Sequence, residues 1–512
     1  MSQDSSLGNN NTPKLFGLWS AISLGWLTLN VFGGMSIIMF VGLSAGGVPA
    51  IIYGFIGSCV AVVCIILTFA QCAARYSTAG GAYHYACFLI PDQYRRQVAY
   101  PLGWMNYLGW IFTHAGCCSI VAKTVLGLVN LCHPDFDVTS RWKLFLVYLA
   151  WDALCWLFNI WGVRGIPTLE LFGCYATALG FVGYTIALLV KAPKADPSFV
   201  FIDVNNDTGY SSNSFAILLG LFSSFATIMG LDGPAHLAEE IPEPKKSLPR
   251  VMLIVILSQF VVGVIWIIVL GFSITNLEAI INTSTGIPVL ELIRQATGSN
   301  AASIVFCLLL IVNNGSSALG SAVTMSRQGY AFARDGGLFC NSKLTELSPG
   351  SHIPFLSITL PSLLVAVVGL VYLFSDTAFN AIIGAQATCM IISFGFPALI
   401  LLITDGSLLP KSDQWNLGIW KRPIYMVSVG YSILVVIVSF MPQSYPVTTE
   451  NMNYTILVMG AFTIGMVLAW TFEGRKLFSP PVNEEVVVAS VMEGYEVEEH
   501  EERMIHVPKA QV

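Results

Sequence analysis

The chain has 512 residues, of which 55% are hydrophobic and 11% are charged, with a formal net charge of −6. Because soluble proteins carry about 25% charged residues, most of this chain cannot face water. No basic nucleic-acid patch, phosphate-cradling glycine loop, zinc spacing or nucleophile elbow is present in the sequence. We therefore expect an integral membrane protein that needs no cofactor, binds no nucleic acid and is not an enzyme.

Twelve stretches approach the about 20 mostly apolar residues that a membrane-spanning helix needs. We expect an all-α protein with a cytoplasmic tail at 1–15, a transmembrane domain at 16–476 and an acidic, disordered cytoplasmic tail at 477–512. The expected spans lie near 16–42, 49–73, 99–128, 143–161, 166–190, 215–239, 250–273, 302–326, 356–374, 379–403, 424–441 and 454–472.

Glycines interrupt the first and sixth of these spans. The first reads LTLNVFGGMSIIMF and is predicted to break at Gly33-Gly34, and the sixth reads FATIMGLDGPAHLAEE and is predicted to break from Gly230 to Pro234. In lipid, unwound backbone is tolerated only where it is buried in protein or lines a cavity. Two broken helices at matching places in the two halves of a chain are typical of secondary transporters and of their substrate sites.

A broken helix offers two opposite electrostatic poles to a ligand. Free N–H groups at the start of one half-helix attract anions, and free carbonyls at the end of the other attract cations. The sequence therefore predicts a site for a small amine, formed by the backbone at Gly33, Gly34, Gly230 and Gly233 with side chains of Asn30 and Asp232. Asp232 is interpreted as an ammonium partner, as a proton carrier, or as a cap of the second half-helix.

Charged residues follow at the predicted cytoplasmic ends of spans 6 and 8. Glu239 and Glu240 lie before the loop IPEPKKSLPR, and Arg327 and Arg334 share a helix face because they are seven residues apart. They are candidates for gating or coupling through ion pairs that close the inner mouth. The alternative is a polar helix end with ordinary positively charged membrane anchors.

Further ionisable groups lie within the spans. His114, Lys123, Asp152 and Glu170 are each candidate proton-coupling groups. We expect no metal site, because His84 has no second histidine or acid at ligand spacing, and we expect the twelve cysteines to serve core packing. Three aromatic residues of span 3, which are Trp104, Tyr107 and Trp110, are either packing residues or the lining of a cation site.

Loop charges predict the orientation. Most of the 24 lysines and arginines fall in the tails and even-numbered loops, which places both termini in the cytoplasm. The sequons at Asn206, Asn282 and Asn453 then lie in outer loops and are glycosylation candidates. We expect a multi-pass protein of the plasma membrane, with the vacuolar membrane as the alternative.

Four segments resemble the amino acid/choline transporter family, a mainly fungal branch of the amino acid–polyamine–organocation superfamily. They are NVFGGMSIIMFVGLSAGGVPAIIYGFI, AARYSTAGGAYHYA, MGLDGPAHLAEEIPEPKKSLPR and SRQGYAFARDGGLF, in the family's order. The resemblance implies a five-plus-five inverted repeat with helices 1 and 6 unwound, plus two extra helices. The chain has Gln71 where the family usually has glutamate at the inner gate, and Leu231 where tyrosine is common in the pocket.

The resemblance also implies transport of an amino acid, 4-aminobutyrate, choline, a polyamine or a similar amine. We expect a secondary active transporter working by alternating access, with a small-molecule amine as its substrate, a proton as a possible coupling ion and the lipid bilayer as its surroundings. The alternative is a non-transporting nutrient sensor of the same fold, which uptake by cells expressing the chain would distinguish.

Overall fold

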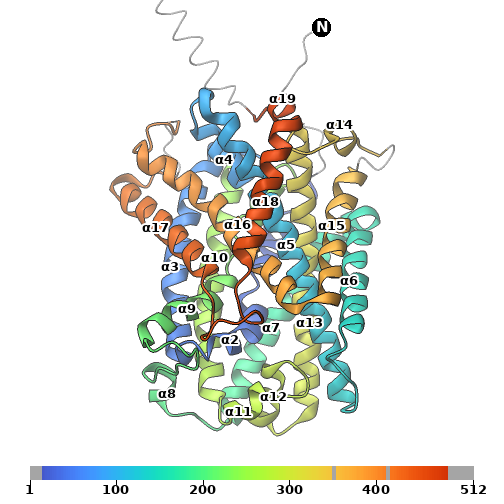
Figure 1. The fold of residues 1–512 in the computed structure, drawn as a ribbon, viewed down its shortest axis with the longest axis vertical. Coiled ribbons are helices and arrows are strands. Elements are labelled where there is room, and N and C mark those ends of the chain that lie inside the picture. The colour runs from blue at the N-terminus through green and yellow to red at the C-terminus, as the bar shows by residue number, and fades with distance from the viewer. Residues whose placement is uncertain (1–13, 349–352, 411–414, 482–512) are drawn as a thin grey trace, which may run out of the picture.

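The computed structural model describes residues 14–348, 353–410 and 415–481 (Figure 1). Within these ranges, 11 helices are long and apolar enough to cross a membrane. The first crossing consists of α1 (Leu18–Leu29) and α2 (Val31–Gly42). The others are α3 (Gly47–Ala73), α5 (Asp92–Cys132), α6 (Arg141–Trp161), α7 (Ile166–Lys191), α10 (Pro244–Ser273), α13 (Asn300–Arg334), α15 (Phe355–Phe374), α16 (Asp376–Ile403), α17 (Lys421–Phe440) and the crossing Thr455–Leu477, in which a π-helical turn extends α18 (Thr455–Ala469).

The sixth predicted crossing is the exception. Its first half is α9 (Asn213–Ala226), whose 14 residues give it a length of about 21 Å, less than the thickness of the hydrocarbon core. A 3₁₀ helix, η2 (Gly233–Leu237), follows, and α-helix resumes only at Pro244 in α10. Within the described residues, the twelve predicted crossings therefore appear as 11 candidate membrane helices, the first of them divided between α1 and α2, and a sixth crossing that is interrupted.

Short helices mark the two ends of the molecule. Figure 1 shows α4 (Ala82–Leu89), α14 (Asn341–Leu344) and α19 (Arg475–Leu477) at one end, and the opposite end holds α8 (Pro197–Phe201), α11 (Leu277–Ile281) and α12 (Pro288–Thr297). The first group follows even-numbered crossings and the second follows odd-numbered ones, so the chain alternates in direction as predicted. We call these the α4 end and the α8 end.

Helices α5 and α13 are the longest and extend beyond the predicted spans 99–128 and 302–326 because their polar ends continue the helix. Small residues allow close packing of α13. A Cβ at Gly315 would overlap the ring of Trp151 on α6, and one at Gly320 would lie 3.0 Å from Thr28 Cγ2 on α1. Close backbone approach of this kind is how membrane helices associate without a hydrophobic driving force.

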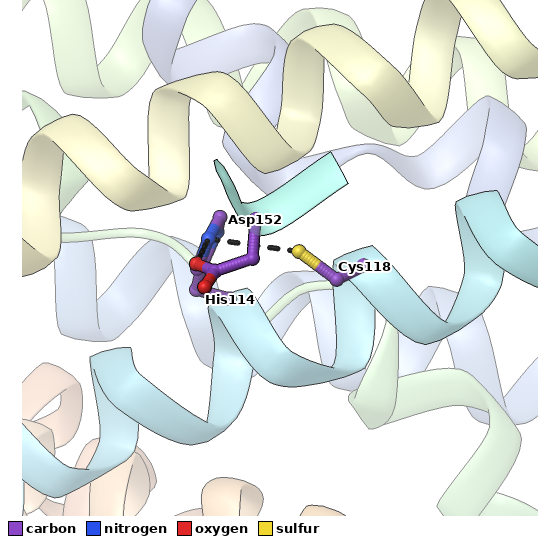
Figure 2. A group of neighbouring side chains, drawn as sticks. All are labelled: His114, Cys118 and Asp152. Atoms are coloured by element: carbon purple, nitrogen blue, oxygen red, sulfur yellow. Dashed lines mark hydrogen bonds and ion pairs between the residues drawn. The ribbon is translucent and has the colours of Figure 1, made fainter. Parts of the chain in front are cut away.

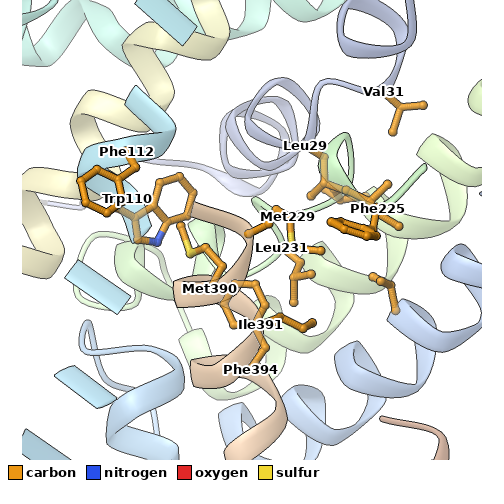
Figure 3. Packing of buried hydrophobic residues seen from close by; sticks show 14 of the residues in the cluster. Leu29, Val31, Trp110, Phe112, Phe225, Met229, Leu231, Met390, Ile391 and Phe394 are labelled. Atoms are coloured by element: carbon orange, nitrogen blue, oxygen red, sulfur yellow. The ribbon is translucent and has the colours of Figure 1, made fainter. Parts of the chain in front are cut away.

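The two interrupted crossings meet at the centre of the apolar core. Figure 3 shows Leu29 of the first crossing near Met229 and Leu231 of the sixth, with Met390 of α16 beside them. These side chains are all buried. The unwound backbone is thus enclosed by packed side chains rather than by lipid, as an unwound segment at membrane depth requires.

Candidate functional site

The first crossing breaks at Asn30. This residue has left-handed backbone angles, φ 50° and ψ 45°, and it separates α1 from α2. The prediction of a break at Gly33-Gly34 was therefore wrong by three residues: both glycines lie in the first turn of α2, and the N–H of Gly34 donates to the carbonyl of Asn30 at 2.8 Å. Asparagine is one of the few residues other than glycine that adopts this conformation readily.

The two glycines are needed for close packing instead. A Cβ at Gly33 would overlap the side-chain oxygen of Asn313 on α13 and would lie 2.6 Å from that of Asn30. Asn30 Nδ2 donates to Asn314 Oδ1 at 2.7 Å. The Oδ1 atoms of Asn30 and Asn313 have no hydrogen-bond partner within the described residues. The start of α2 is thus surrounded by buried amide groups of α13.

The sixth crossing unwinds where the glycines predict. Residues 227–232 form no helix, and Gly230 lies so close to α1 that a Cβ there would be 2.6 Å from the carbonyl oxygen of Thr28. Pro234 occupies the first turn of η2, as expected for a helix start. The expected second half-helix is limited to this 3₁₀ segment, however, and turns continue to Glu243.

A cavity of about 580 Å³ lies between the two breaks and reaches toward the α8 end. Loop residues 450–455 form its outer rim. This loop follows Tyr445, whose N–H donates at 2.7 Å to the carbonyl of Thr208, in the segment after α8. The inner lining includes Thr28, Leu29, Asn30, Gly34, Thr113, Cys117, Thr227, Met229, Gly230 and Ser317.

Three of the seven predicted substrate residues, Asn30, Gly34 and Gly230, line this cavity; the other four, Gly33, Leu231, Asp232 and Gly233, are not part of its lining. Nor are the predicted aromatic residues of α5, which are Trp104, Tyr107 and Trp110.

Charged side chains are scarce in the lining. Among the described residues that line the cavity, only Lys123 and Glu450 carry charge. Glu450 belongs to the outer loop. Lys123 is about 15 Å further along α5 than Thr113, and its ammonium lies 5.8 Å from the ring centroid of Tyr372. The part of the cavity next to the breaks is therefore polar but uncharged.

Asp232 is completely buried behind the cavity. Its Oδ2 accepts from Asn106 Nδ2 at 2.8 Å and lies 3.0 Å from His236 Nε2, while His236 Nδ1 lies 2.7 Å from the carbonyl oxygen of Ala79. Because a carbonyl oxygen only accepts, Nδ1 carries a hydrogen. With that hydrogen on Nδ1, the contact between Nε2 and Oδ2 is a hydrogen bond only if a proton lies between these two atoms.

The predicted gating acids and arginines meet at the α4 end. Glu240 Oε1 accepts from Arg327 Nε at 2.8 Å, and Glu239 Oε1 accepts from Arg334 Nη2 at 2.9 Å. Lys14 also donates to the carbonyl of Glu239 at 2.9 Å. These contacts join the non-helical part of the sixth crossing to α13, at the end opposite the cavity mouth.

Gln71, the remaining gating candidate, lies elsewhere. It is buried on α3 and accepts from the hydroxyl of Tyr425 on α17 at 2.6 Å. Glu170 on α7 is also fully buried, and neither of its carboxylate oxygens has a partner within the described residues. A buried carboxylate without a partner is costly at this depth.

The three sequons differ in their surroundings. The amide of Asn206 donates to the carbonyl of Tyr210 at 2.9 Å, and that of Asn453 donates to the carbonyl of Ser439 at 2.7 Å. Asn282 is exposed after α11. All three lie at or near the α8 end, and Asn282 is the most accessible of them.

Sequence reasoning missed three asparagines, Asn106, Asn313 and Asn314. All are buried polar residues in the middle of apolar crossings. That position was itself an available signal, because a buried amide within a membrane requires partners inside the protein.

Two interrupted helices meeting at a cavity inside an all-α membrane domain define a secondary transporter for small organic substrates. The profile of the amino acid permease family matches residues 16–462. The chain belongs to the amino acid permease family, which confirms the resemblance seen in the four sequence segments.

Known proteins similar to the chain are transporters. It is 29% identical to a choline transporter of Saccharomyces cerevisiae, over 92% of this chain and 83% of that protein. It is 24% identical to the amino-acid permease BAT1 of Arabidopsis thaliana, over 91% of this chain and 93% of that protein. The solved structure of Mhp1, a nucleobase-cation-symport-1 family transporter with bromovinylhydantoin bound, superposes with a TM-score of 0.52 at 13% identity, covering 92% of this chain and 97% of Mhp1. The likeness to Mhp1 confirms the fold prediction.

Proposed function

We propose that the chain transports a zwitterionic amine, such as an amino acid or 4-aminobutyrate. The observation that carries this proposal is the uncharged lining beside the two breaks. A cation without a counter-charge is costly in such surroundings, whereas a zwitterion is neutral overall. Its ammonium would face the carbonyl end of α1, and its carboxylate would face the N–H groups at the start of α2.

Alternating access follows from the two ends of the cavity. The structure is open toward the α8 end and closed at the α4 end by the Glu240–Arg327 and Glu239–Arg334 pairs. We take the α8 end as the outside, because the sequons and few basic residues are there. Opening the inner route would require these ion pairs to separate, so the four residues act as an inner gate.

Proton coupling is proposed at the Asp232–His236 pair. Both side chains are fully buried, and Asp232 itself belongs to the unwound segment, so a proton shared at this contact would lie at the break. Loss of that proton would leave a carboxylate facing a histidine lone pair. The proton therefore stabilises the local conformation of the sixth crossing, and its release would accompany a change in that conformation.

Uptake measurements test the substrate class. The full chain would be expressed in cells lacking their own amine permeases, and uptake of a labelled amino acid would be competed with 4-aminobutyrate, choline and a polyamine. We expect zwitterions to compete best and to be accumulated at the plasma membrane. Strong competition by choline or polyamine alone would contradict the uncharged-site argument, and absence of any uptake from a correctly localised protein would favour the sensor.

The proton site has its own test. Asp232→Asn and His236→Gln should each remove the pH dependence of uptake while exchange of internal for external substrate survives. The matched control is Asp335→Asn, which changes another buried acid that contacts a histidine, His84, at 2.7 Å at the α4 end. A loss of affinity with an unchanged pH profile would assign Asp232 to the substrate instead, and no change in either would remove Asp232 from the mechanism. The interpretation of Asp232 as a helix cap is wrong in this structure, because it is the N-cap residue of η2 but its side chain makes no capping hydrogen bond.

A further inference from the structure

Three potential metal ligands converge away from the substrate cavity. His114 and Cys118 are one turn apart on α5, and Asp152 reaches them from α6 (Figure 2). His114 Nε2 lies 3.1 Å from Asp152 Oδ1 and 3.6 Å from Cys118 Sγ. The ligand atoms all lie within 4.8 Å of one another, and all three residues are buried.

The atoms that would not bind a metal are already held by neighbouring helices. Ser321 Oγ on α13 donates to the carbonyl of Ala318 at 2.8 Å, so it accepts from His114 Nδ1 at 3.0 Å. The hydrogen on Nδ1 leaves the Nε2 lone pair free. Ser362 Oγ on α15 donates to Asp152 Oδ2 at 3.0 Å, which leaves Oδ1 available. Outer contacts of this kind orient metal-binding histidines and carboxylates.

We propose that His114, Cys118 and Asp152 bind a divalent transition metal, with Zn²⁺ as the best fit. Tetrahedral zinc with ordinary bond lengths places nitrogen and oxygen ligands about 3.3 Å apart and nitrogen and sulfur ligands about 3.5 Å apart. The two distances from Nε2, 3.1 Å to Asp152 Oδ1 and 3.6 Å to Cys118 Sγ, match these edges. Three protein ligands with one remaining position for water is an established arrangement for zinc.

Charge balance supports the same assignment. A thiolate and a carboxylate would together cancel the two positive charges of the metal, while a neutral imidazole adds none. The filled site is then neutral, as its depth within the membrane domain requires. The expectation that the cysteines serve only core packing would fail at Cys118, although it would still hold for thiols such as Cys59 on α3.

A bound metal would link α5 to α6. Hydrogen bonds of Ser321 and Ser362 would connect the site to α13 and α15. It is independent of the proposed substrate and of the proton pair in the sixth crossing. A metal there would hold fixed the helices against which the interrupted crossings move, with one coordination position left for water.

Metal content of the purified full-length protein tests the site. After equilibration with Zn²⁺ and removal of loosely bound ions, wild type and Cys59→Ser should retain one zinc per chain by elemental mass spectrometry. Cys118→Ser and Asp152→Asn should lose most of it. Ser321→Ala leaves every ligand in place and should weaken zinc binding about 10- to 100-fold.

Cobalt provides a readout that does not depend on transport. Co²⁺ bound to wild type should show a thiolate-to-cobalt absorption band that is absent in Cys118→Ser, measured on monodisperse protein so that misfolded variants are excluded. Equal zinc content in wild type and Cys118→Ser, or no retained metal in folded wild type, would overturn the proposal and leave His114 and Asp152 as a proton-sharing pair.

Discussion

Neutralising the inner gate should shift the protein away from its outward-open state. The Glu240–Arg327 pair is the more enclosed one, with side chains 11% and 15% exposed, whereas those of Glu239 and Arg334 are 19% and 38% exposed. A charged hydrogen bond in the first setting contributes about 2–3 kcal/mol, and an exposed pair contributes about 1 kcal/mol or less. The variant Glu239→Gln/Glu240→Gln therefore loses roughly 3 kcal/mol of inner-gate closure, the middle of the range that these two contributions allow.

This loss corresponds to a change of about 150-fold in the ratio of inward-open to outward-open molecules. An outward population of about 99% would fall to about 40%. Cys117 is a natural reporter of that population, because it lines the cavity that reaches toward the α8 end.

The assay is the rate at which a membrane-impermeant thiol reagent labels Cys117 on intact cells. The exposed thiol of Cys132 is first removed as Cys132→Ser. We expect labelling to slow at least twofold in the double variant. Glu243→Gln is the matched control, because it removes the same charge from the same segment but breaks only an exposed contact with Lys246. Unchanged labelling in the double variant would refute the gate.

Three substitutions test other parts of the site. Gly33→Ala should abolish uptake because its Cβ would overlap a buried asparagine oxygen. Gly57→Ala is the control and should transport normally, because no atom lies within 4 Å of the new Cβ. Equal uptake by both variants would show that α2 is not held as described. Gly233→Leu should leave the protein at the membrane but block uptake, since even a Cβ there would lie 3.1 Å from Thr28 Oγ1, and normal uptake would contradict that packing. Asn282→Gln should remove an N-glycan detectable as a mobility shift after glycosidase treatment, and a glycan that persists would assign modification to another sequon.

The sequence predicted the membrane fold well because composition and span length determine it. It placed the sixth break correctly, because glycine and proline residues cluster there. It misplaced the first break, because Gly33-Gly34 was interpreted as an unwinding signal. In the structure these glycines admit the side chains of α13 and Thr227, and Asn30 alone turns the chain.

The contacts that define the sites depend on distant segments. His114 and Asp152 were each identified as buried ionisable groups, yet nothing in the sequence indicated that they touch each other. The spacing of His114 and Cys118 by one helical turn was an available hint that the sequence reasoning did not use. Likewise, the residues that line the cavity depend on how the two interrupted crossings are positioned relative to each other. Residue types alone do not specify that position.

The two interruptions differ in their mechanical freedom. The first consists of Asn30 alone, so α1 and α2 can only change their mutual angle, because both halves retain a fixed rise of about 1.5 Å per residue. The stretch between α9 and α10 contains no α-helix, and extended backbone there can reach a rise of about 3.3 Å per residue. This stretch can therefore lengthen or shorten along the membrane normal. Glu239 and Glu240 at the inner gate can then move while Gly230 stays in the cavity wall.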